Sequence, residues 1–241
     1  MKLYLAGSGW QKIWMPDEFY NFYRLQTFYH ISKTEAKIIH KYKEFLLDSG
    51  AFSMFSGVNI DIKKYVNDYI DFINQYNIKY FFELDIYAII GNKETEDIRE
   101  YIEIKTNKKV IPVWHIFLGV DYYKMLCKKY NYIAIGASGQ HDSKWTRKQP
   151  EKLKKLVQYA NSKNVKVHGL GYTNHKGLLE IPFYSVDSTS WLSGNRFGAV
   201  YKFKNNTMEK YNKPDGKRIV TNVVAKNNFY EWVKYQKFLD R

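Results

Sequence analysis

The stretch VKVHGLGYTNHKGLLEIPFYSVDS, residues 165–188, decides the fold. It contains two short apolar runs, at 165–171 and 183–188, separated by a polar turn and a short helical pattern. Runs that are apolar nearly throughout are typical of parallel strands covered on both faces. Polar residues interrupt both runs, notably His168 in the first and Asp187 in the second.

The same unit recurs along the chain. The other apolar runs are LYLAG (3–7), FLLDSGAF (45–52), YFFELDIY (80–87), VIPVWHIF (110–117) and YIAIGAS (132–138), and an eighth strand is predicted near AVYKF (199–203). Helical patterns fill the gaps at 60–77, 96–107, 120–131 and 150–164, and an amphipathic helix over about 226–240 closes the chain.

Alternating strands and helices indicate βα units. We therefore predict an α/β protein with a (β/α)8 TIM-type barrel, forming a single domain over residues 1–241 without a zinc subdomain. A doubly wound open sheet is the alternative.

Polar residues interrupt the apolar runs late in each predicted strand. They are Asp48 with Ser49, Glu83 with Asp85, His115, Ser138, His168 and Asp187. The carboxyl ends of barrel strands open on one face, where the active sites of this fold are built. A buried carboxylate without a partner is costly, so a core role for all the aspartates is unfavourable. The alternative for Asp48 and Asp187 is that each caps the following turn.

The composition favours a polyanionic partner. Lys and Arg total 38 against 24 Asp and Glu, a net charge of +14, and 18% of the residues are aromatic. Basic residues bind phosphates with release of counterions, and aromatic rings can stack on bases. A solvated lysine-rich surface, with the aromatic content reflecting an AT-rich coding bias, is the alternative.

Other classes of protein are disfavoured by what the sequence contains. Cys127 is alone, so neither an intrachain disulfide nor a cysteine-rich zinc site can form, and no run is long and apolar enough for a membrane span or a signal peptide. These features predict a cytoplasmic protein, located in the host cytoplasm if the gene belongs to a phage. No phosphate-binding, dinucleotide-binding, HExxH or GxSxG motif is present, so neither a cofactor nor a metal is expected.

What remains is a pocket of separated carboxylates, small residues and aromatic side chains. This combination suits chemistry at a sugar carbon, where one carboxylate attacks and another transfers a proton.

These segments resemble the tRNA-guanine transglycosylase superfamily, most closely its compact phage and bacterial DNA 7-deazaguanine transglycosylases. The resemblance rests on LDSGAF (47–52), FELDIY (82–87), PVWHIF (112–117), IAIGASG (133–139), VHGLG (167–171) and SVDSTSWLSGNRFG (185–198). In the last segment Arg196 and Gly198 keep the family's intervals from the aspartate.

The resemblance implies a role for each matching residue. Asp187 is implied as the nucleophile that holds a covalent sugar intermediate, and Asp48 as the acid/base group. Asp85 is implied to accept hydrogen bonds from the N1 and N2 edge of guanine. The remaining base-binding residues are implied to be Phe52, Ser49, His115, Gly136, Ala137, His168 and Gly169.

Three further side chains are candidates for contact with nucleic acid. Arg196 and Arg147 are expected to touch the phosphate backbone, with ordinary surface charge as the alternative. Trp191 is expected to stack on or wedge into nucleic acid, and a packed loop aromatic is the alternative.

The departures from the family favour DNA over tRNA as the substrate. The chain cannot form the zinc site of the tRNA enzymes, and it has Ala137 and Ser193 where that family has Gly and Arg. We therefore expect guanine in DNA to be exchanged for a 7-deazaguanine such as preQ0. The alternatives are a DNA glycosylase, a tRNA-guanine transglycosylase and a non-catalytic nucleic-acid-binding barrel. The sequence leaves open whether a homodimer or a partner protein is needed.

Overall fold

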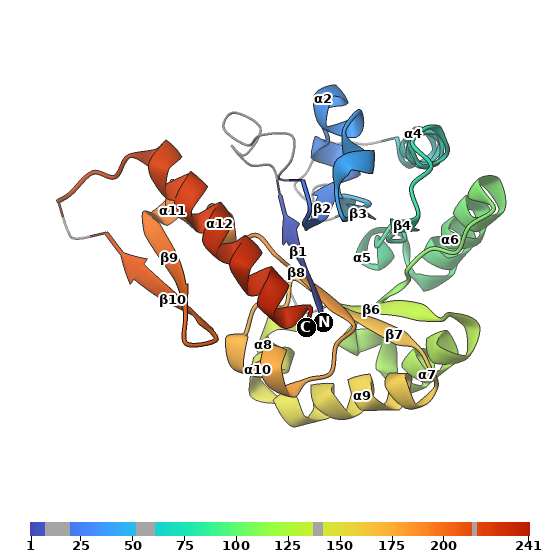
Figure 1. Cartoon of the computed structure of the whole chain (residues 1–241). Helices are drawn as coiled ribbons and strands as arrows, with labels where there is room; N and C mark the ends of the chain where they lie inside the picture. The colour runs from blue at the N-terminus through green and yellow to red at the C-terminus, as the bar shows by residue number, and fades with distance from the viewer. Residues whose placement is uncertain (8–19, 52–60, 137–141, 214–215) are drawn as a thin grey trace.

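The structure is a computed structural model that describes residues 1–7, 20–51, 61–136, 142–213 and 216–241. Within these residues eight parallel strands form one sheet in the order β4-β3-β2-β1-β8-β7-β6-β5 (Figure 1). The strands are β1 (Lys2–Ala6), β2 (Tyr23–Thr27), β3 (Glu44–Asp48), β4 (Tyr80–Phe81), β5 (Val113–Trp114), β6 (Tyr132–Gly136), β7 (Lys166–Leu170) and β8 (Ser185–Ser188).

The sheet curls into a TIM-type barrel. Strands that follow one another in sequence lie next to one another, and β1 pairs with β8. The two remaining ends meet through a parallel bridge between Phe82 and Ile111. There the amide of Ile111 donates to the Phe81 carbonyl at 2.9 Å, and the amide of Glu83 donates to the Ile111 carbonyl at 3.1 Å. The predicted (β/α)8 TIM-type barrel is confirmed.

One predicted barrel strand is wrong. Residues 199–203 belong to β9 (Ala199–Lys204), which forms an antiparallel hairpin with β10 (Thr207–Asn212) outside the barrel. The barrel strand that the sequence pattern misses is β2, because Arg24 interrupts its apolar run. The Arg24 side chain is fully buried and pairs with Glu35 at 2.7 Å, so the charge has a partner inside the protein.

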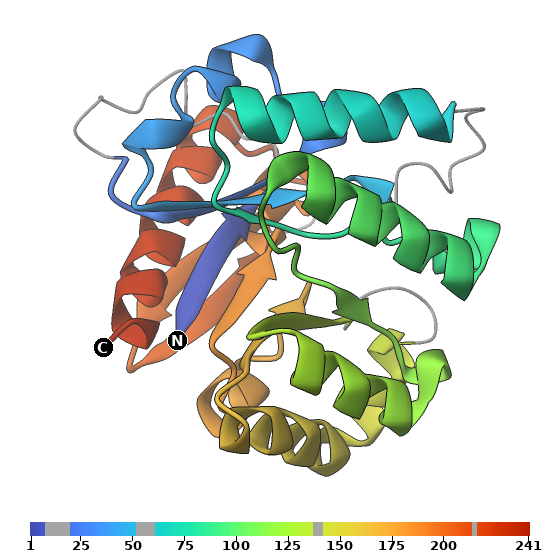
Figure 2. The same ribbon diagram turned by 90° about the vertical axis from the view of Figure 1, so that its right-hand side faces the viewer.

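Helices cover the outside of the barrel (Figure 2). They are α2 (Lys33–Ala36), α4 (Ile62–Gln75), α5 (Tyr87–Ile90), α6 (Asn92–Thr106), α7 (Gly119–Lys129), α8 (Asp142–Lys148), α9 (Pro150–Ser162), α10 (His175–Glu180), α11 (Ser193–Phe197) and α12 (Thr221–Leu239), with 3-10 turns η2 (Phe28–His30), η3 (Ile39–Lys41), η4 (Ile116–Leu118) and η5 (Ser190–Leu192). The closing helix α12 begins at Thr221, earlier than the predicted start near residue 226.

Local sequence explains where α4 begins and which face it buries. The Asp61 carboxylate accepts a hydrogen bond from the Lys64 amide at 3.0 Å, as an N-cap should. The residues facing the barrel recur every three or four positions: Val66, Tyr69, Ile70 and Ile73.

Two apolar clusters lie on the two sides of the barrel wall. Alternate strand residues fill the interior, namely Tyr4, Ala6, Tyr23, Leu25, Leu46, Phe82, Ile111, Val113, Tyr132 and Ala134. Their neighbours point outward into a larger cluster that they share with the helices. A filled interior leaves the rims of the barrel as the places where a ligand can enter.

The seam between β4 and β5 is reinforced by side chains, since each of these strands has only two residues. The Glu83 carboxylate accepts from the Val113 amide at 2.5 Å and from the Arg99 Nε at 2.7 Å. Arg99 also donates to the hydroxyls of Tyr87 at 2.6 Å and Tyr122 at 2.8 Å. Burial raises the pKa of Glu83 to about 7, and the Arg99 charge opposes that rise.

Arg99→Met should destabilise the fold by about 3–5 kcal/mol at pH 8, because the buried Glu83 carboxylate loses its counter-ion. The loss should be smaller at pH 5, where Glu83 without Arg99 takes up a proton and becomes neutral. Urea denaturation at both pH values measures the difference. Lys93→Met, which removes an exposed cation from the same helix, is the control. An equal loss at the two pH values would contradict this account of the seam.

Candidate active site at the carboxyl mouth of the barrel

Three carboxylates meet at the carboxyl rim of the barrel. Asp48 ends β3, Asp187 lies in β8, and Asp85 follows β4. Burial raises the pKa of Asp48 to about 6, the backbone amide of Gly50 opposes the rise, and the charges of Asp187 and Asp85 add to it. Carboxylates influence one another in this way only at short range, so the three share one site.

Asp187 is held through one of its two oxygens. Its Oδ1 accepts hydrogen bonds from the Gly171 amide at 2.6 Å and from His168 Nε2 at 3.1 Å. Among the described residues, no donor is recorded for Oδ2. The carboxylate is therefore fixed in orientation while its second oxygen stays available to a reacting group.

A buried hydrogen-bonded chain leads from the barrel interior to Asp187. The Tyr132 hydroxyl lies 2.6 Å from Ser185 Oγ, and Ser185 Oγ lies 2.7 Å from His168 Nδ1. Every group is satisfied if Tyr132 donates to Ser185, Ser185 donates to Nδ1 and Nε2 donates to the Asp187 carboxylate. In this arrangement His168 holds the Asp187 side chain in position.

The expectation that the His168 side chain binds the base is wrong. Its exposed fraction is 0%, and its ring packs within the barrel with the Phe82 ring at 5.1 Å. No face of the imidazole is open to a ligand, so His168 acts through Asp187.

Asp85 and His115 form a second polar pair that remains partly accessible. His115 Nε2 lies 2.8 Å and 2.9 Å from the two Asp85 oxygens, and the side chains are 15% and 22% exposed for His115 and Asp85. The Phe117 ring stacks on His115, with centroids 5.4 Å apart and planes at 10°, and Phe117 is 61% exposed. An accessible carboxylate beside a solvent-facing ring can bind the edge and face of a flat, polar ligand.

The structure places the other predicted base-binding residues in different surroundings. Gly136 ends β6 at the rim, and Ser49 is buried beside Asp48, where its Oγ has no hydrogen-bond partner among the described residues. Gly169 faces outward, and a Cβ there would lie 3.1 Å from the Phe183 ring, so a glycine is needed for close packing, and its base-binding role stays a prediction. Phe52 and Ala137, like Ser138, lie outside the described residues.

The predicted nucleic-acid contacts are also only partly placed. Trp191 is 1% exposed, and its indole N–H donates to the Ala6 carbonyl at 2.9 Å, so it is a core residue and the expected stacking is wrong. Arg147 is exposed on α8. Arg196 lies in α11, and its side chain is outside the description.

Sequence reasoning missed Ser185, Tyr132 and Phe117. Ser185 could have been found, because it lies two residues before Asp187 in the same strand and therefore points to the same side. Tyr132 and Phe117 carried no such signal, since each looks like one more ring in an aromatic-rich chain.

In the part of the chain that the structure describes, no group of three or more His, Cys, Asp or Glu residues could hold a metal ion. No helix among the described residues is long and apolar enough to cross a membrane. The Cys127 thiol is buried and free.

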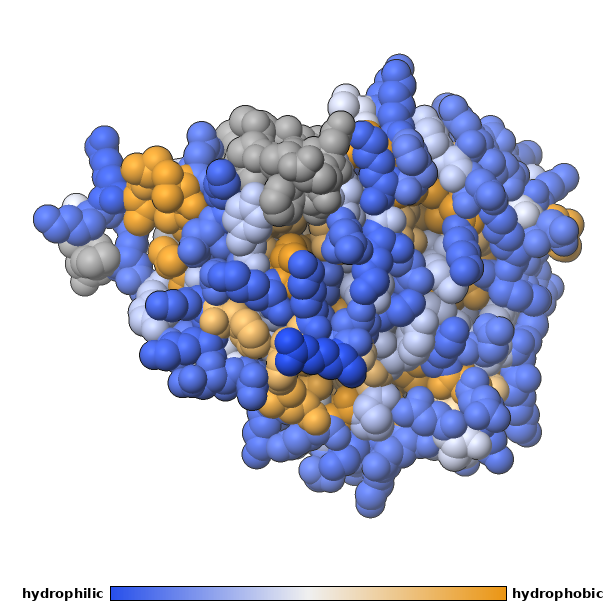
Figure 3. All heavy atoms as spheres, in the orientation of Figure 1, coloured by the Kyte–Doolittle hydropathy of each residue, from blue (hydrophilic) through white to orange (hydrophobic). Residues whose placement is uncertain are grey.

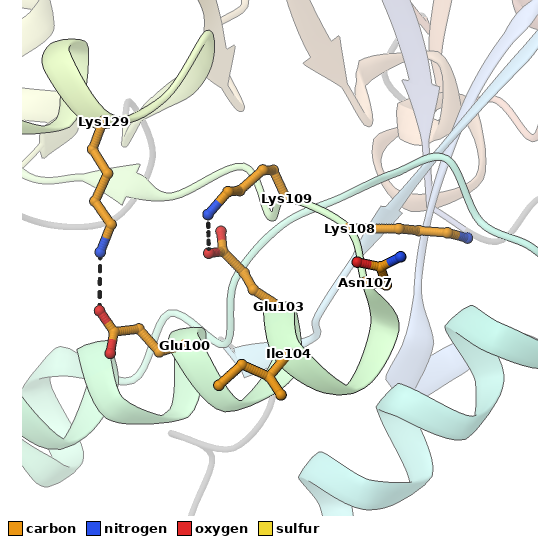
Figure 4. Close-up of a pocket in the computed structure, with 7 residues that line it drawn as sticks. All are labelled: Glu100, Glu103, Ile104, Asn107, Lys108, Lys109 and Lys129. Atoms are coloured by element: carbon orange, nitrogen blue, oxygen red, sulfur yellow. Dashed lines mark hydrogen bonds and ion pairs between the residues drawn. The ribbon is translucent and has the colours of Figure 1, made fainter.

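A separate hollow, lined by none of these mouth residues, lies on the surface by α6 and α7 (Figure 4). It is lined by residues at the ends of α6 and α7 and the segment after α6: Glu100, Glu103, Ile104, Asn107, Lys108, Lys109 and Lys129. Two of its lysines are already paired, Lys129 with Glu100 at 2.9 Å and Lys109 with Glu103 at 2.7 Å. With its charges largely neutralised, the hollow offers little to a charged ligand.

Comparison with known proteins identifies no family. No family model matches the chain, and no curated protein matches it. A solved structure described as "QR15, an Aldolase" is similar at 14% identity and a TM-score of 0.48, covering 78% of this chain and 89% of that one. Neither the identity nor the TM-score supports an inference about activity.

These findings correct the expected membership of the tRNA-guanine transglycosylase superfamily. No model of that family matches, and the similar solved structure is described as an aldolase. The chain therefore has an assigned fold, an eight-stranded TIM-type barrel, and no assigned family.

Asp48→Asn should stabilise the protein at pH 8 and have little effect at pH 4. The folded-state pKa of Asp48 lies above its ordinary value, so ionisation disfavours folding, and this penalty grows as the pH rises from about 4 to about 6. A shift of about two pKa units corresponds to at most about 3 kcal/mol. Chemical denaturation of both proteins across this range measures the gain, and Asp121→Asn at an exposed site is the control. A constant difference at all pH values would contradict the raised pKa.

Proposed function

We propose that this protein breaks and re-forms the N-glycosidic bond between a base and its sugar in nucleic acid. The observation that carries the proposal is the contrast between two neighbouring carboxyl groups. Burial raises the pKa of Asp48 to about 6, while Asp187 Oδ1 is held by His168 Nε2 and the Gly171 amide, and Oδ2 has no donor among the described residues. Paired carboxyl groups with divergent environments supply an acid and a nucleophile in glycosidic chemistry.

The first half of the reaction uses both groups. Asp187 Oδ2 attacks the anomeric carbon, the bond from that carbon to the base nitrogen breaks, and an ester joins Asp187 to the sugar. Asp48, protonated in part near neutral pH, donates a proton to the departing base. His168 and the Gly171 amide keep Oδ1 fixed, so the attacking oxygen holds its direction.

The second half reverses these roles. Asp48, now a carboxylate, takes the proton from the nitrogen of an incoming base, and that nitrogen attacks the anomeric carbon. The ester bond breaks and Asp187 is released as a carboxylate. Asp85 supports both halves as an acceptor for N–H groups on a base edge, and guanine has two adjacent donors of this kind.

The charge of the chain favours nucleic acid as the substrate. The net charge is +14, and an excess of basic residues attracts the phosphate backbone. For the reaction, a base must also leave its stack before a group in the barrel mouth can reach its sugar. We propose DNA as the nucleic acid and a 7-deazaguanine such as preQ0 as the incoming base.

Asp187→Asn should abolish base release from guanine-labelled duplex DNA, with a loss of at least about a thousandfold, because the amide is a poor nucleophile. Release is measured with and without preQ0, and mass spectrometry of the denatured wild-type protein should detect the sugar ester. Asp121→Asn is the control, and thermal unfolding confirms that both variants fold.

Each arm of this experiment has a distinct meaning. Label release from DNA only with preQ0 supports exchange, whereas release without any added base indicates a glycosylase, with water resolving the ester. Release from tRNA alone would replace the proposed substrate. Undiminished release by Asp187→Asn would rule out the mechanism, and no release from any substrate would leave a binding protein.

Asp85→Asn should lower kcat/KM for guanine-containing DNA about 10- to 100-fold, because the amide offers one acceptor and one donor where guanine needs two acceptors. The preference for guanine over hypoxanthine, which lacks the exocyclic amine, should narrow. Competition between the two labelled substrates measures it. An unchanged preference would remove Asp85 from base recognition.

A further inference from the structure

Helix α12 runs antiparallel to β1 and extends past the rim of the barrel. At its carboxyl end, the Met1 amine donates to the Leu239 carbonyl at 2.7 Å, and Gln236 Nε2 donates to the Leu3 carbonyl at 2.5 Å. Further along, the Phe229 ring packs on Trp191, which bonds to the last residue of β1. The amino end of α12 therefore stands at the level of the candidate active site.

The hairpin β9–β10 is fastened to this helix. Asn228 accepts from the Tyr201 amide at 2.8 Å and donates to the Ala199 carbonyl at 2.9 Å. The Glu231 carboxylate accepts from the Phe203 amide at 2.7 Å. Side chains of α12 thus complete the hydrogen bonds of β9, and the hairpin and the helix form one raised unit beside the mouth.

Large apolar side chains are exposed on this unit and on the segments that lead into it. Phe197, ten residues after Asp187, is 72% exposed, Tyr211 is 50% exposed and Val220 is 67% exposed. Figure 3 shows an apolar patch over the amino end of α12, surrounded by hydrophilic atoms. Exposed apolar groups concentrated in one place mark an interaction site.

Basic side chains lie among these apolar groups. A Cβ on Gly198 would lie 2.8 Å from the Lys213 side chain, so Lys213 lies against Gly198, the residue that follows Phe197. Lys213 Nζ donates to the Lys217 carbonyl at 3.1 Å, which brings Lys217 and Arg218 into the same surface. None of these three cations forms an ion pair with a carboxylate among the described residues. We call Phe197, Tyr211, Lys213, Lys217, Arg218 and Val220 the rim platform.

We propose that the rim platform binds the phosphate backbone and an unstacked base of the DNA whose sugar enters the barrel mouth. The identity of the strand as DNA rests on the proposed function, and the surface itself rests on the contacts above. Unpaired cations bind phosphates and an exposed ring stacks on a base, which is how single strands are held beside a reactive site.

Charge favours nucleic acid over a second copy of this chain. Residues 199–226 carry seven Lys or Arg residues and two Asp or Glu residues. Two copies meeting through this unit would bring these positive charges together, which opposes association. A polyanion gains from the same arrangement.

The test is equilibrium binding of fluorescein-labelled DNA, a 20-base-pair duplex and a 20-nucleotide single strand, to the full chain. All proteins carry Asp187→Asn, so that no turnover occurs. The triple variant Lys213→Gln, Lys217→Gln, Arg218→Gln should weaken duplex binding about 10- to 100-fold. The slope of log affinity against log salt should fall by about 2–3, close to 0.9 for each lost phosphate contact.

Two further variants are needed. The first tests whether the location of the lost charge matters, and the second tests base stacking. Lys128→Gln, Lys155→Gln, Lys163→Gln removes the same charge from the ends and faces of α7 and α9 and should leave the salt slope unchanged. Phe197→Ala should weaken single-strand binding about 5- to 100-fold with an unchanged salt slope, because it removes stacking and no charge.

The outcomes distinguish this proposal from the proposed function. An unchanged affinity and salt slope in the rim variant, with base release by the wild type, would overturn the platform and leave the function standing. A platform-dependent affinity without base release from any substrate would support the platform and reject the function. A wild-type dimer that becomes a monomer in Phe197→Ala, measured by sedimentation, would make the occupant a second copy and overturn the proposal.

Discussion

The bridge between Phe82 and Ile111 is the constraint on which the rest of the structure depends. Without it the eight strands form an open sheet, in which β4 and β5, the strands that precede Asp85 and His115, lie at opposite edges. With it, all strand ends share one rim. The bridge is short, and the buried Glu83–Arg99 pair beside it supplies hydrogen bonds that two-residue strands cannot.

The mouth gives two chemically identical side chains different properties. Burial and two neighbouring carboxylates raise the pKa of Asp48 although the Gly50 and Ser49 amides oppose the rise, and Asp187 Oδ1 is fixed by a backbone amide and an imidazole. The difference arises from the strands and loops that surround each group. A fold that fixes backbone positions around a rim can therefore tune proton affinity without any change of residue type.

The barrel could be predicted from the sequence because its strands are short apolar runs, and most of the mouth could be predicted because polar residues end those runs. Strand β2 could not, since Arg24 is accommodated by Glu35, a partner that only the folded chain brings near. The same reason explains His168 and Trp191. The sequence gives no sign that these side chains are buried. In the folded chain the two His168 nitrogens hydrogen-bond to Ser185 and Asp187, and the Trp191 indole N–H donates to the Ala6 carbonyl.

The buried Arg24–Glu35 pair also limits how this sequence can evolve. Arg24 reaches across to the Leu5 and Leu25 carbonyls as well as to Glu35, so loss of Glu35 alone strands a positive charge inside the protein. Replacement of both residues by apolar ones of similar volume leaves no buried charge without a partner. Related chains should therefore keep both residues or replace both, and a chain with only one of them should have a less stable fold.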